Sequence, residues 1–403
     1  MVKVKSWLFT EVRGKVKKAE FRRRKNKVTE LSQKRIPFNP RTERQQKVRK
    51  AYGKCVEEWN NLSEAEKREW RIIGTLHGIS GYNAFMRECI SEKLGVVWYE
   101  ITIDNSANPN DLTDYQILLN IVNDSTFFNN CENEQKYLEF YDSDKASLLN
   151  HFVEEFDTIN KNAKIWIKVP SIPANASKII YLKINTSRTE DLSNPYNVFE
   201  FYDDFEGDAL NTDIWYVSSP DYSVSNSILR INQGGIGMND PLTFNLQEGY
   251  AVETKCLFNE PPISGYSGVM PEVSSSRFTK GGNTGADATA FPMSSGTSGD
   301  VVLYAASGSG TGYNIANGTF LFTSEENVWY LMSIRMSNGK LKIVKDDDVV
   351  FSETGINWKK NIRYVALGRF DGESSKDIRD TSYDFIRIRK YTEPEPVISY
   401  EKA

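Results

Sequence analysis

The sequence predicts a mainly β protein, in which two antiparallel β-sandwiches follow a basic arm and a small three-helix module. Apolar residues recur at every second position through much of residues 95–391, which is the spacing of half-buried strands. The chain of 403 residues has 26 Gly and 14 Pro to form turns, and its aromatic fraction of 12% supplies large buried side chains. These three observations favour sandwiches over a helical or α/β fold.

Charge divides the chain after Leu94. Residues 1–94 hold 24 Lys and Arg against 11 Asp and Glu, whereas residues 95–403 hold 26 against 43. The spacing of apolar residues changes from helical to strand-like at the same place, so we expect a domain boundary there. The predicted regions are a basic arm (1–40), a helical module (41–94), a first β-sandwich (95–195), a second β-sandwich (196–392) and an extended tail (393–403).

The arm interleaves cations with Val and Phe, a pattern compatible with one or two short strands. Its candidate contact residues are Arg22, Arg23, Arg24, Lys25 and Lys27. Such a cluster can neutralise nucleic-acid phosphates or dock on an acidic protein surface. A solvated tail with no partner is the third alternative.

Helix signals begin at Thr42. Thr42 with Gln45 and Ser63 with Glu66 have the spacing of capping boxes, which open two helices. A third helix, from about 82 to 93, places Phe85 and Met86 on one face with a cysteine. The tryptophans at 59 and 70 can close a small core between the three helices.

The cysteines are Cys55, Cys89, Cys131 and Cys256. Their scattered positions do not form a disulfide framework or a close-spaced metal site, so we expect buried or unreactive thiols. No apolar run approaches the length of a membrane helix, and the N-terminal apolar run is too short for a secretory signal.

The first sandwich is predicted from strands that alternate. In 97–103 the residues expected to face the core alternate with Trp98, Glu100 and Thr102, which are expected to face outward. In 164–169 the residues expected to face the core alternate with outward positions that include Trp166. The run 178–184 is expected to be a more fully buried strand.

The second sandwich is predicted from a hairpin and a closing strand. Two strands, 330–336 and 340–344, flank Ser337-Asn338-Gly339, which is a strong turn signal. In the closing strand 382–389, Ile386 and Ile388 point inward and Arg387 and Arg389 point outward. Residues 393–397 are expected to leave the fold as an extended exit.

Three stretches resemble known families. Val12-Arg-Gly-Lys, Asn39-Pro-Arg-Thr-Glu-Arg, Trp59 to Trp70 and Ser80-Gly-Tyr-Asn-Ala-Phe85 together resemble a module of phage, prophage and archaeal virus proteins. Trp59 to Lys67 is also similar to the second half of an HMG box. The segment similar to the opening of that fold, Asn83 to Met86, comes after it, and this reversed order argues against DNA bending by a wedge.

The other two resemblances lie in the β-rich part. Pieces such as Trp98-Tyr-Glu-Ile-Thr-Ile and Ile165-Trp-Ile-Lys-Val-Pro-Ser-Ile-Pro-Ala, continuing to Gly207, resemble an archaeal β-domain of unknown function found on cell-surface and viral proteins. Asp203 to Trp215 is similar to the first strand of a concanavalin A-like (laminin G-like) jelly roll, in which the Trp caps the sandwich. This resemblance implies a jelly roll over residues 196–392.

Nothing in the sequence assembles a catalytic site. Glycoside hydrolases with this jelly roll present Glu-x-Asp-x-x-Glu or Glu-x-Asp-x-Glu on one strand, and neither run occurs. The two histidines, His77 and His151, fall in separate modules, which disfavours His-based nucleophilic catalysis. The Gly-rich tract that begins at Lys280 has no phosphate-binding fingerprint. We therefore expect a protein that is not an enzyme and has no catalytic residues.

Ligand recognition is placed in residues 261–316, which are rich in Ser, Gly, Thr and aromatic residues. The candidate ligand-binding residues are Tyr266, Phe278, Asn283, Asp287, Tyr304 and Tyr313. Aromatic faces with short polar groups suit a sugar, although loops anchored by their aromatics give the same pattern. Asp287 with backbone carbonyls is a possible Ca²⁺ site.

These observations favour a structural protein on the exterior of an archaeal virion, with display on an archaeal cell surface as the alternative. The N-terminal part would anchor to other virion proteins or nucleic acid, and the sandwiches would bind a host-surface glycan or protein, without a membrane span and as a homo-oligomer. The alternatives are a glycan-degrading enzyme and a nucleic-acid-binding protein.

Overall fold

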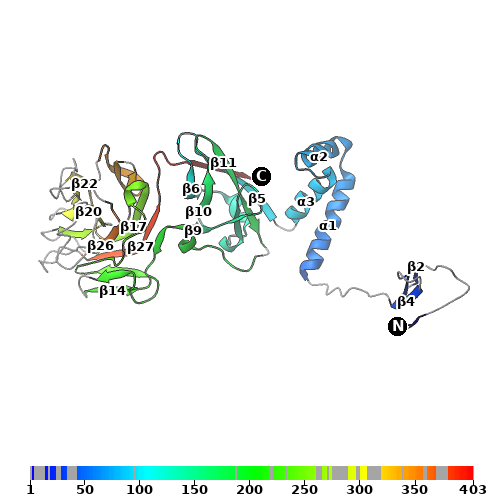
Figure 1. Ribbon diagram of the computed structural model, residues 1–403, viewed down its shortest axis with the longest axis horizontal. Coiled ribbons are helices and arrows are strands. Elements are labelled where there is room, and N and C mark those ends of the chain that lie inside the picture. Colours follow the sequence, from blue (N-terminus) through cyan, green and yellow to red (C-terminus); the bar gives the residue numbers. More distant parts are fainter. Residues whose placement is uncertain are drawn as a thin grey trace, which may run out of the picture. The chain divides into compact units, whose positions relative to one another are not determined.

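The structure is a computed structural model. It describes residues 2–3, 14–16, 19–23, 29–33, 43–93, 96–186, 188–217, 221–232, 234–259, 266–269, 272–274, 289–295, 300–305, 319–337, 339–356, 361–368 and 380–402. The chain divides into two compact units, Met1–Leu94 and Gly95–Ala403. The first unit contains the arm and the helices, and the second contains the two sandwiches (Figure 1).

The arm contains more β-structure than its pattern predicts. Its described backbone forms four short strands in the order β1-β4-β3-β2. They are β1 (Val2–Lys3), β2 (Gly14–Val16), β3 (Ala19–Arg23) and β4 (Thr29–Gln33). All three pairings are antiparallel.

The three helices form where the sequence predicts them, as α1 (Glu43–Asn61), α2 (Glu64–Leu76) and α3 (Gly81–Lys93). The predicted capping box of α2 is present, since Ser63 Oγ accepts from the Glu66 amide and the Ser63 amide donates to Glu66 Oε2. A Cβ at Gly74 would lie 2.7 Å from a backbone oxygen in the following loop, so the crossing of α2 and α3 requires a residue without a side chain there.

A small core joins the helices. Phe85 and Met86 are buried there with both cysteines, and the indoles of Trp59 and Trp70 pack against Phe85. Ile73 and Leu76, which follow Trp70 at helical spacing, remain exposed. No described helix of the chain is both long and apolar enough to cross a membrane.

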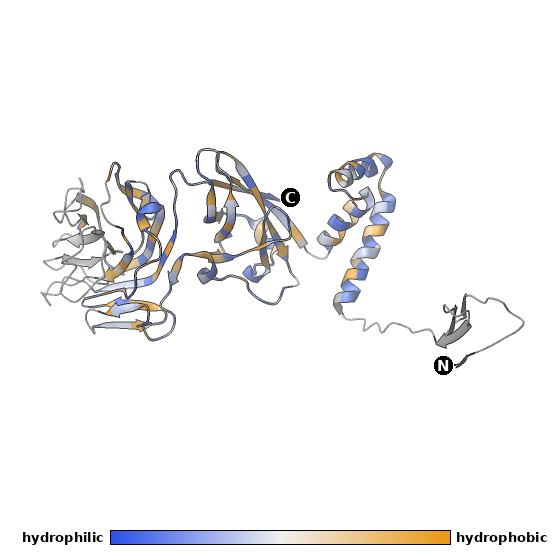
Figure 2. Cartoon of the chain, in the orientation of Figure 1, coloured by the Kyte–Doolittle hydropathy of each residue, from blue (hydrophilic) through white to orange (hydrophobic). Residues whose placement is uncertain are grey.

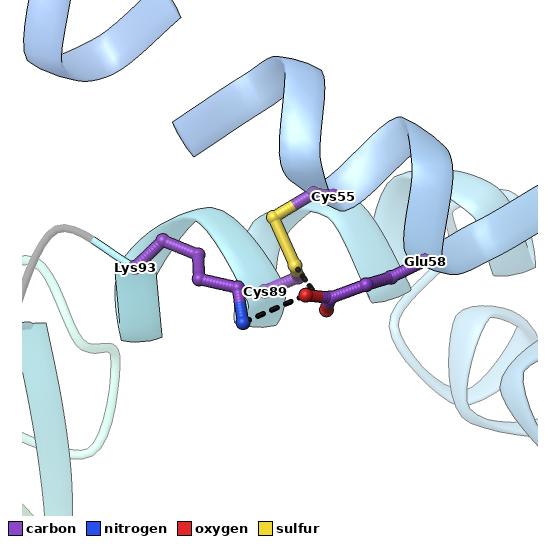
Figure 3. Close-up of a disulfide and its surroundings, with 4 residues drawn as sticks. All are labelled: Cys55, Glu58, Cys89 and Lys93. Carbon is purple, nitrogen blue, oxygen red and sulfur yellow. Dashed lines mark hydrogen bonds and ion pairs between the residues drawn. A yellow bond between two sulfur atoms is a disulfide. The ribbon is translucent and has the colours of Figure 1, made fainter. Parts of the chain in front are cut away.

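The expectation that every cysteine is an unpaired thiol is wrong, because Cys55 and Cys89 form a disulfide between α1 and α3 (Figure 3). Both cysteines face the shared core, which brings their side chains together although 34 residues separate them in the sequence. Beside the bond, Lys93 Nζ lies 2.8 Å from Glu58 Oε1. Cys131 and Cys256 are free and buried.

Opening this disulfide should destabilise the helical unit selectively. A cross-link that closes a loop of 34 residues stabilises by roughly 3–4 kcal/mol in the chain-entropy description. We expect the double variant Cys55→Ser, Cys89→Ser to show faster hydrogen exchange in residues 43–93, measured by mass spectrometry on the full chain. Peptides from residues 96–186 are the internal control, and equal acceleration in both regions contradicts the prediction.

The first sandwich has a three-stranded sheet, β6-β10-β9, facing a five-stranded sheet, β28-β5-β11-β7-β8. The strands are β5 (Val96–Asp104), β6 (Leu112–Ile121), β7 (Leu138–Tyr141), β8 (Leu148–Leu149), β9 (His151–Asp157), β10 (Asn162–Ile172), β11 (Ser177–Asn185) and β28 (Val397–Lys402). Short helices α4 (Ser125–Asn130) and η1 (Gln135–Tyr137) follow β6. Hydrophobic and hydrophilic residues alternate along the strands (Figure 2).

The strand expected to be fully buried is buried on one face only. In β11, Ile180, Leu182 and Ile184 enter the core, whereas Ile179 is exposed and Tyr181 half-buried on the other face. The reason is that no second layer covers this side of the described five-stranded sheet.

The tail expected to leave the fold instead completes it. Residues 397–402 form strand β28, which pairs antiparallel with β5, so the C-terminus lies beside the start of the first sandwich (Figure 1). Ile398 and Tyr400 pack against the first core. Residues 201–390 are therefore inserted between β11 and β28 of the first sandwich.

His151 is buried in the first sandwich with its ring 4.8 Å from that of Phe140. Neither ring nitrogen has a hydrogen-bond partner, and burial lowers the pKa of the imidazole to about 4. The neutral ring is therefore the form that the native structure accepts.

Unit 2 should lose stability as the pH falls from 6.5 to 4. Because the native pKa of His151 lies below the usual value of 6.5, the unfolded chain binds more protons in this range, which lowers the free energy of unfolding by about 3 kcal/mol. His151→Phe should reduce this slope in calorimetry of the full chain, and His77→Gln in the other unit is the control. An unchanged slope in His151→Phe contradicts the assignment.

The second sandwich is a jelly roll of two antiparallel sheets, and the predicted fold class is confirmed. One sheet has the order β14-β15-β27-β17-β23-β24-β25 with β12 also on β27, and the other has β13-β16-β26-β19-β20-β21-β22 with β18 on β20. The elements of the first of these sheets are β12 (Phe201–Asp203), β14 (Tyr222–Ser225), β15 (Ile228–Ile231), β17 (Tyr250–Phe258), β23 (Trp329–Ser337), β24 (Lys340–Lys345), β25 (Asp348–Glu353) and β27 (Thr381–Lys390). Those of the second are β13 (Trp215–Val217), β16 (Gly235–Met238), β18 (Tyr266–Val269), β19 (Glu272–Ser274), β20 (Thr289–Ser295), β21 (Asp300–Ala305), β22 (Thr319–Thr323) and β26 (Tyr364–Gly368).

Two predicted features of the jelly roll are present. Trp215 is buried in its core, and its indole N–H donates to Asp203 Oδ2 at 2.6 Å. The hairpin around Ser337 and Gly339 joins β23 to β24, and Gly339 has a φ of 78°, which a glycine adopts without strain. Helix α5 (Pro195–Val198) connects the first sandwich to β12, and a short 3₁₀ helix, η2 (Leu246–Glu248), precedes β17.

Candidate functional site

The residues predicted to bind ligand are not brought together by described side chains. Tyr266 lies in β18 and Tyr304 in β21, where the backbone alone is described. Phe278, Asn283, Asp287 and Tyr313 lie outside the described residues. In the arm, Arg22 and Arg23 lie in β3, again as backbone, and Arg24, Lys25 and Lys27 lie outside the described residues.

The Ca²⁺ prediction falls on Asp287 and so lies outside the described part of the chain. Within the described ranges, no three or more His, Cys, Asp or Glu residues gather as metal ligands. The structure places functional side chains elsewhere, at the joint between the two sandwiches.

The joint is built on the outward face of β27. Arg387 and Arg389 point away from the jelly-roll core, as the alternation predicts, but their side chains are only 2% and 3% exposed. The first sandwich covers them, which the sequence pattern did not indicate. Two buried cations need partners, because an unpaired buried charge is strongly unfavourable.

Glu253 of β17 supplies the central counter-charge. Its Oε2 accepts from Arg387 Nε at 2.7 Å, and its Oε1 accepts from Arg389 Nε at 3.0 Å. Burial alone would raise the pKa of the Glu253 carboxyl, but the guanidinium groups of Arg389 and Arg387 outweigh burial and hold the pKa well below its usual range. The glutamate is therefore ionised across the neutral pH range.

The first sandwich completes the network. Arg387 Nη1 lies 2.9 Å from Glu154 Oε1 of β9, and Arg389 Nη1 donates to Glu395 Oε1 at 2.6 Å. The Arg387 guanidinium also lies over the ring of Trp166, 4.7 Å from its centroid. The indole N–H of Trp166 in turn donates to Glu154 Oε2 at 2.6 Å. Trp166, predicted to point outward, is thus buried against the jelly roll.

Both chain crossings between the sandwiches are fixed by hydrogen bonds. Buried Gln116 of β6 donates to the Val198 carbonyl at 2.9 Å, and its own carbonyl accepts from the Lys390 amide at 2.8 Å. Tyr115 donates to Glu395 at 3.2 Å on the return crossing. These contacts tie the start and the end of the jelly roll to one strand.

Two adjoining cavities open along the joint, and Glu154, Lys164, Leu331 and Arg387 line both. The larger has a volume of about 570 Å³ and the smaller about 450 Å³. Both volumes lie in the usual range of ligand sites. We refer to the two together as the groove.

The larger cavity combines aromatic rings with paired charges. Its described lining contributes the rings of Phe152, Tyr202, Trp329 and Phe385. Two lysines there have carboxylate partners, with Lys255 at 2.7 Å from Asp384 and Lys164 at 3.6 Å from Glu155. Lys255 Nζ also lies 5.3 Å from the centroid of the Trp329 ring. A ligand with apolar faces and hydroxyl groups finds partners for both in this lining.

Sequence reasoning missed this site although signals for it existed. The strands β17 and β27 are neighbours, and Glu253, Arg387 and Arg389 stand at their outward positions. Alternation predicts polar residues at such positions, so the sequence alone indicates charges exposed to solvent. An outward Trp on β10 was the signal that a partner surface covers that sheet, because exposed tryptophan is uncommon.

A family model matches part of the chain. Residues 134–218 match the Domain of unknown function (DUF2341). The matched segment runs from the turn before β7 to the end of β13. It includes Glu154, Trp166 and the segment in which the chain first crosses from the first sandwich to the jelly roll. No curated protein matches the chain.

Solved structures match about half of the chain at low identity. An endo-β-1,3-glucanase from Pyrococcus furiosus is 13% identical, with 48% of this chain and 95% of that chain covered and a TM-score of 0.36. A laminarinase from Flavobacterium is 14% identical over 48% and 100%, with a TM-score of 0.37. A carbohydrate-binding module from Bacillus subtilis is 9% identical over 44% and 95%, with a TM-score of 0.30.

The prediction that the chain is not an enzyme is contradicted by these matches. Structures titled as endo-glucanases are among them, beside a carbohydrate-binding module. The absence of the acid motif on one strand is therefore not evidence that the chain lacks catalytic activity.

The stability of the joint should depend on the negative charge of Glu253. Glu253→Gln leaves Arg387 and Arg389 buried beside a neutral amide, which we expect to lower the stability of unit 2 by about 3–5 kcal/mol. The control is Glu155→Gln, which removes an exposed ion pair worth less than about 1 kcal/mol. Calorimetry of the full chain measures both variants, and equal effects would show that Glu253 is not the centre of the joint.

Proposed function

We propose that this protein recognises a carbohydrate in the groove between its two sandwiches. The observation that carries the proposal is the larger cavity, where aromatic rings stand beside carboxylate–lysine pairs. Pyranose rings have apolar faces that stack on aromatic side chains, and hydroxyl groups that donate to carboxylates and accept from ammonium groups. The carbohydrate-active proteins among the similar folds agree with this ligand class.

The setting that we propose is extracellular, on a virus particle or on a cell surface. The Cys55–Cys89 disulfide supports it, since disulfides persist mainly in oxidising surroundings. The excess of basic residues before Leu94 suits anchoring to an acidic assembly, which leaves the sandwiches to meet the ligand.

Degradation of the bound glycan is a second candidate, and the carboxylates of the groove favour it. Glu154, Asp204 and Asp346 all line the larger cavity, and glycoside hydrolysis requires one carboxyl group as acid and another as nucleophile or base. Release of new reducing ends from a bound oligosaccharide, lost in Glu154→Gln or Asp204→Asn, would establish this function over binding alone.

Trp329→Ala should weaken glycan binding by roughly tenfold or more, because the lost stacking and burial are worth about 1.5–3 kcal/mol. A glycan array with the full chain identifies a ligand, and calorimetric titration then compares variants. Tyr52→Ala removes an exposed aromatic side chain from the other unit and is the matched control. An unchanged affinity in Trp329→Ala rules out the groove as the site.

A further inference from the structure

A second group of aromatic side chains lies on the solvent face of the first sandwich, away from the groove. Trp98 of β5, Tyr181 of β11 and Tyr141 of β7 stand on the face opposite the core, because their neighbours Tyr99, Leu182 and Phe140 are buried in it. We call these three residues the aromatic patch. None of them is part of the sandwich core.

Register and ring distances bring the patch together. Tyr181 pairs with Tyr141 across β11 and β7, and Trp98 pairs with Lys183 across β5 and β11. The Trp98 ring centroid lies 5.7 Å from that of Tyr141 and 6.3 Å from that of Tyr181. All three rings are half-buried by one another, and exposed Ile179 stands on the same face.

Three of the cations around the patch have carboxylate partners, and Lys145 has none among the described residues. Lys183 Nζ and Arg188 Nε lie 3.2 Å and 2.7 Å from the carboxylate of Glu139. Lys178 Nζ lies 2.7 Å from Asp142. Lys145 Nζ instead lies 4.0 Å from the ring centroid of Tyr181 and 5.6 Å from that of Trp98, and it forms no ion pair within the described part of the chain.

The turn that carries Lys145 is held in a fixed shape. Asp144 accepts hydrogen bonds from the amides of Ala146 and Ser147, both at 2.8 Å, and from the Ser147 hydroxyl at 2.6 Å. The Lys145 amide donates to the Asp142 carbonyl at 2.9 Å. This turn holds the backbone of Lys145 so that its ammonium group, which has no carboxylate partner among the residues that the structure describes, lies beside two aromatic rings before any ligand arrives. This arrangement reduces the entropy lost on binding.

We propose that the aromatic patch binds an acidic sugar, such as a uronic acid residue of a polysaccharide. The apolar face of the pyranose stacks on Trp98, and its carboxylate pairs with Lys145. Glu100, the cross-strand partner of Tyr181, stands on the same face and repels an anion, so the ligand carboxylate pairs with Lys145 and points away from Glu100. This site is independent of the groove and of the ligand proposed for it.

The test compares an acidic oligosaccharide with its neutral form on the full chain. Calorimetric titration with a galacturonic acid oligomer and with its methyl ester measures the contribution of the ligand carboxylate. We expect the acid to bind at least tenfold more tightly than the ester. Lys145→Met should remove this preference, and Trp98→Ala should weaken binding of both forms.

Matched variants in the groove separate the two sites. Lys164→Met and Trp329→Ala remove one lysine and one tryptophan from the groove lining and should leave uronate binding at the patch unchanged. Equal affinity for acid and ester, no binding of either, or an equal loss in the groove variants overturns the proposal. Lys145→Met alters an exposed turn, so it tests the charge without disturbing the sheet.

Discussion

The buried carboxylate of Glu253 is the contact on which the architecture of unit 2 depends. It lies between two arginines of the neighbouring strand, and the same arginines reach Glu154 of the other sandwich and Glu395 of the return crossing. Burying two guanidinium groups without a central anion is unfavourable by several kcal/mol. The joint is therefore specific in register, because a shift of β17 by one residue would move Glu253 to the core face of its sheet.

The path of the chain explains why this joint holds. The jelly roll is inserted between β11 and β28, so the chain crosses from one sandwich to the other twice, and the hydrogen bonds of Gln116 and Tyr115 fix both crossings. Two crossings restrict rotation about the joint more than a single linker would. A groove between such sandwiches has a constant shape, which is the condition for placing aromatic rings and charges at set distances around a sugar.

The local sequence pattern predicts the strands, the hairpin at Gly339, the capping box at Ser63 and the fold class, because each depends on neighbours in sequence. It also predicts correctly that Trp166, Arg387 and Arg389 face away from their own cores. It does not predict that these three side chains meet, since their contact depends on how two separately folded sandwiches pack. The disulfide escaped prediction for the same reason, because 34 residues separate its cysteines. The groove is thus a property of tertiary packing, whereas the ligand residues expected in 261–316 lie largely outside the described chain.

Trp166 and Trp98 share one sequence feature, a tryptophan at an outward strand position, but have two different structural roles. Both stand at outward positions of strands in the first sandwich, and each has a cation near its ring. At Trp166 that cation is Arg387 of the jelly roll, which has buried carboxylate partners, so the contact is complete within the chain. At Trp98 one nearby cation is Lys145, which has no carboxylate partner among the described residues and remains half-exposed. The joint satisfies its charges within the chain, whereas a surface that leaves an ammonium group beside half-buried rings can bind an anion from solution.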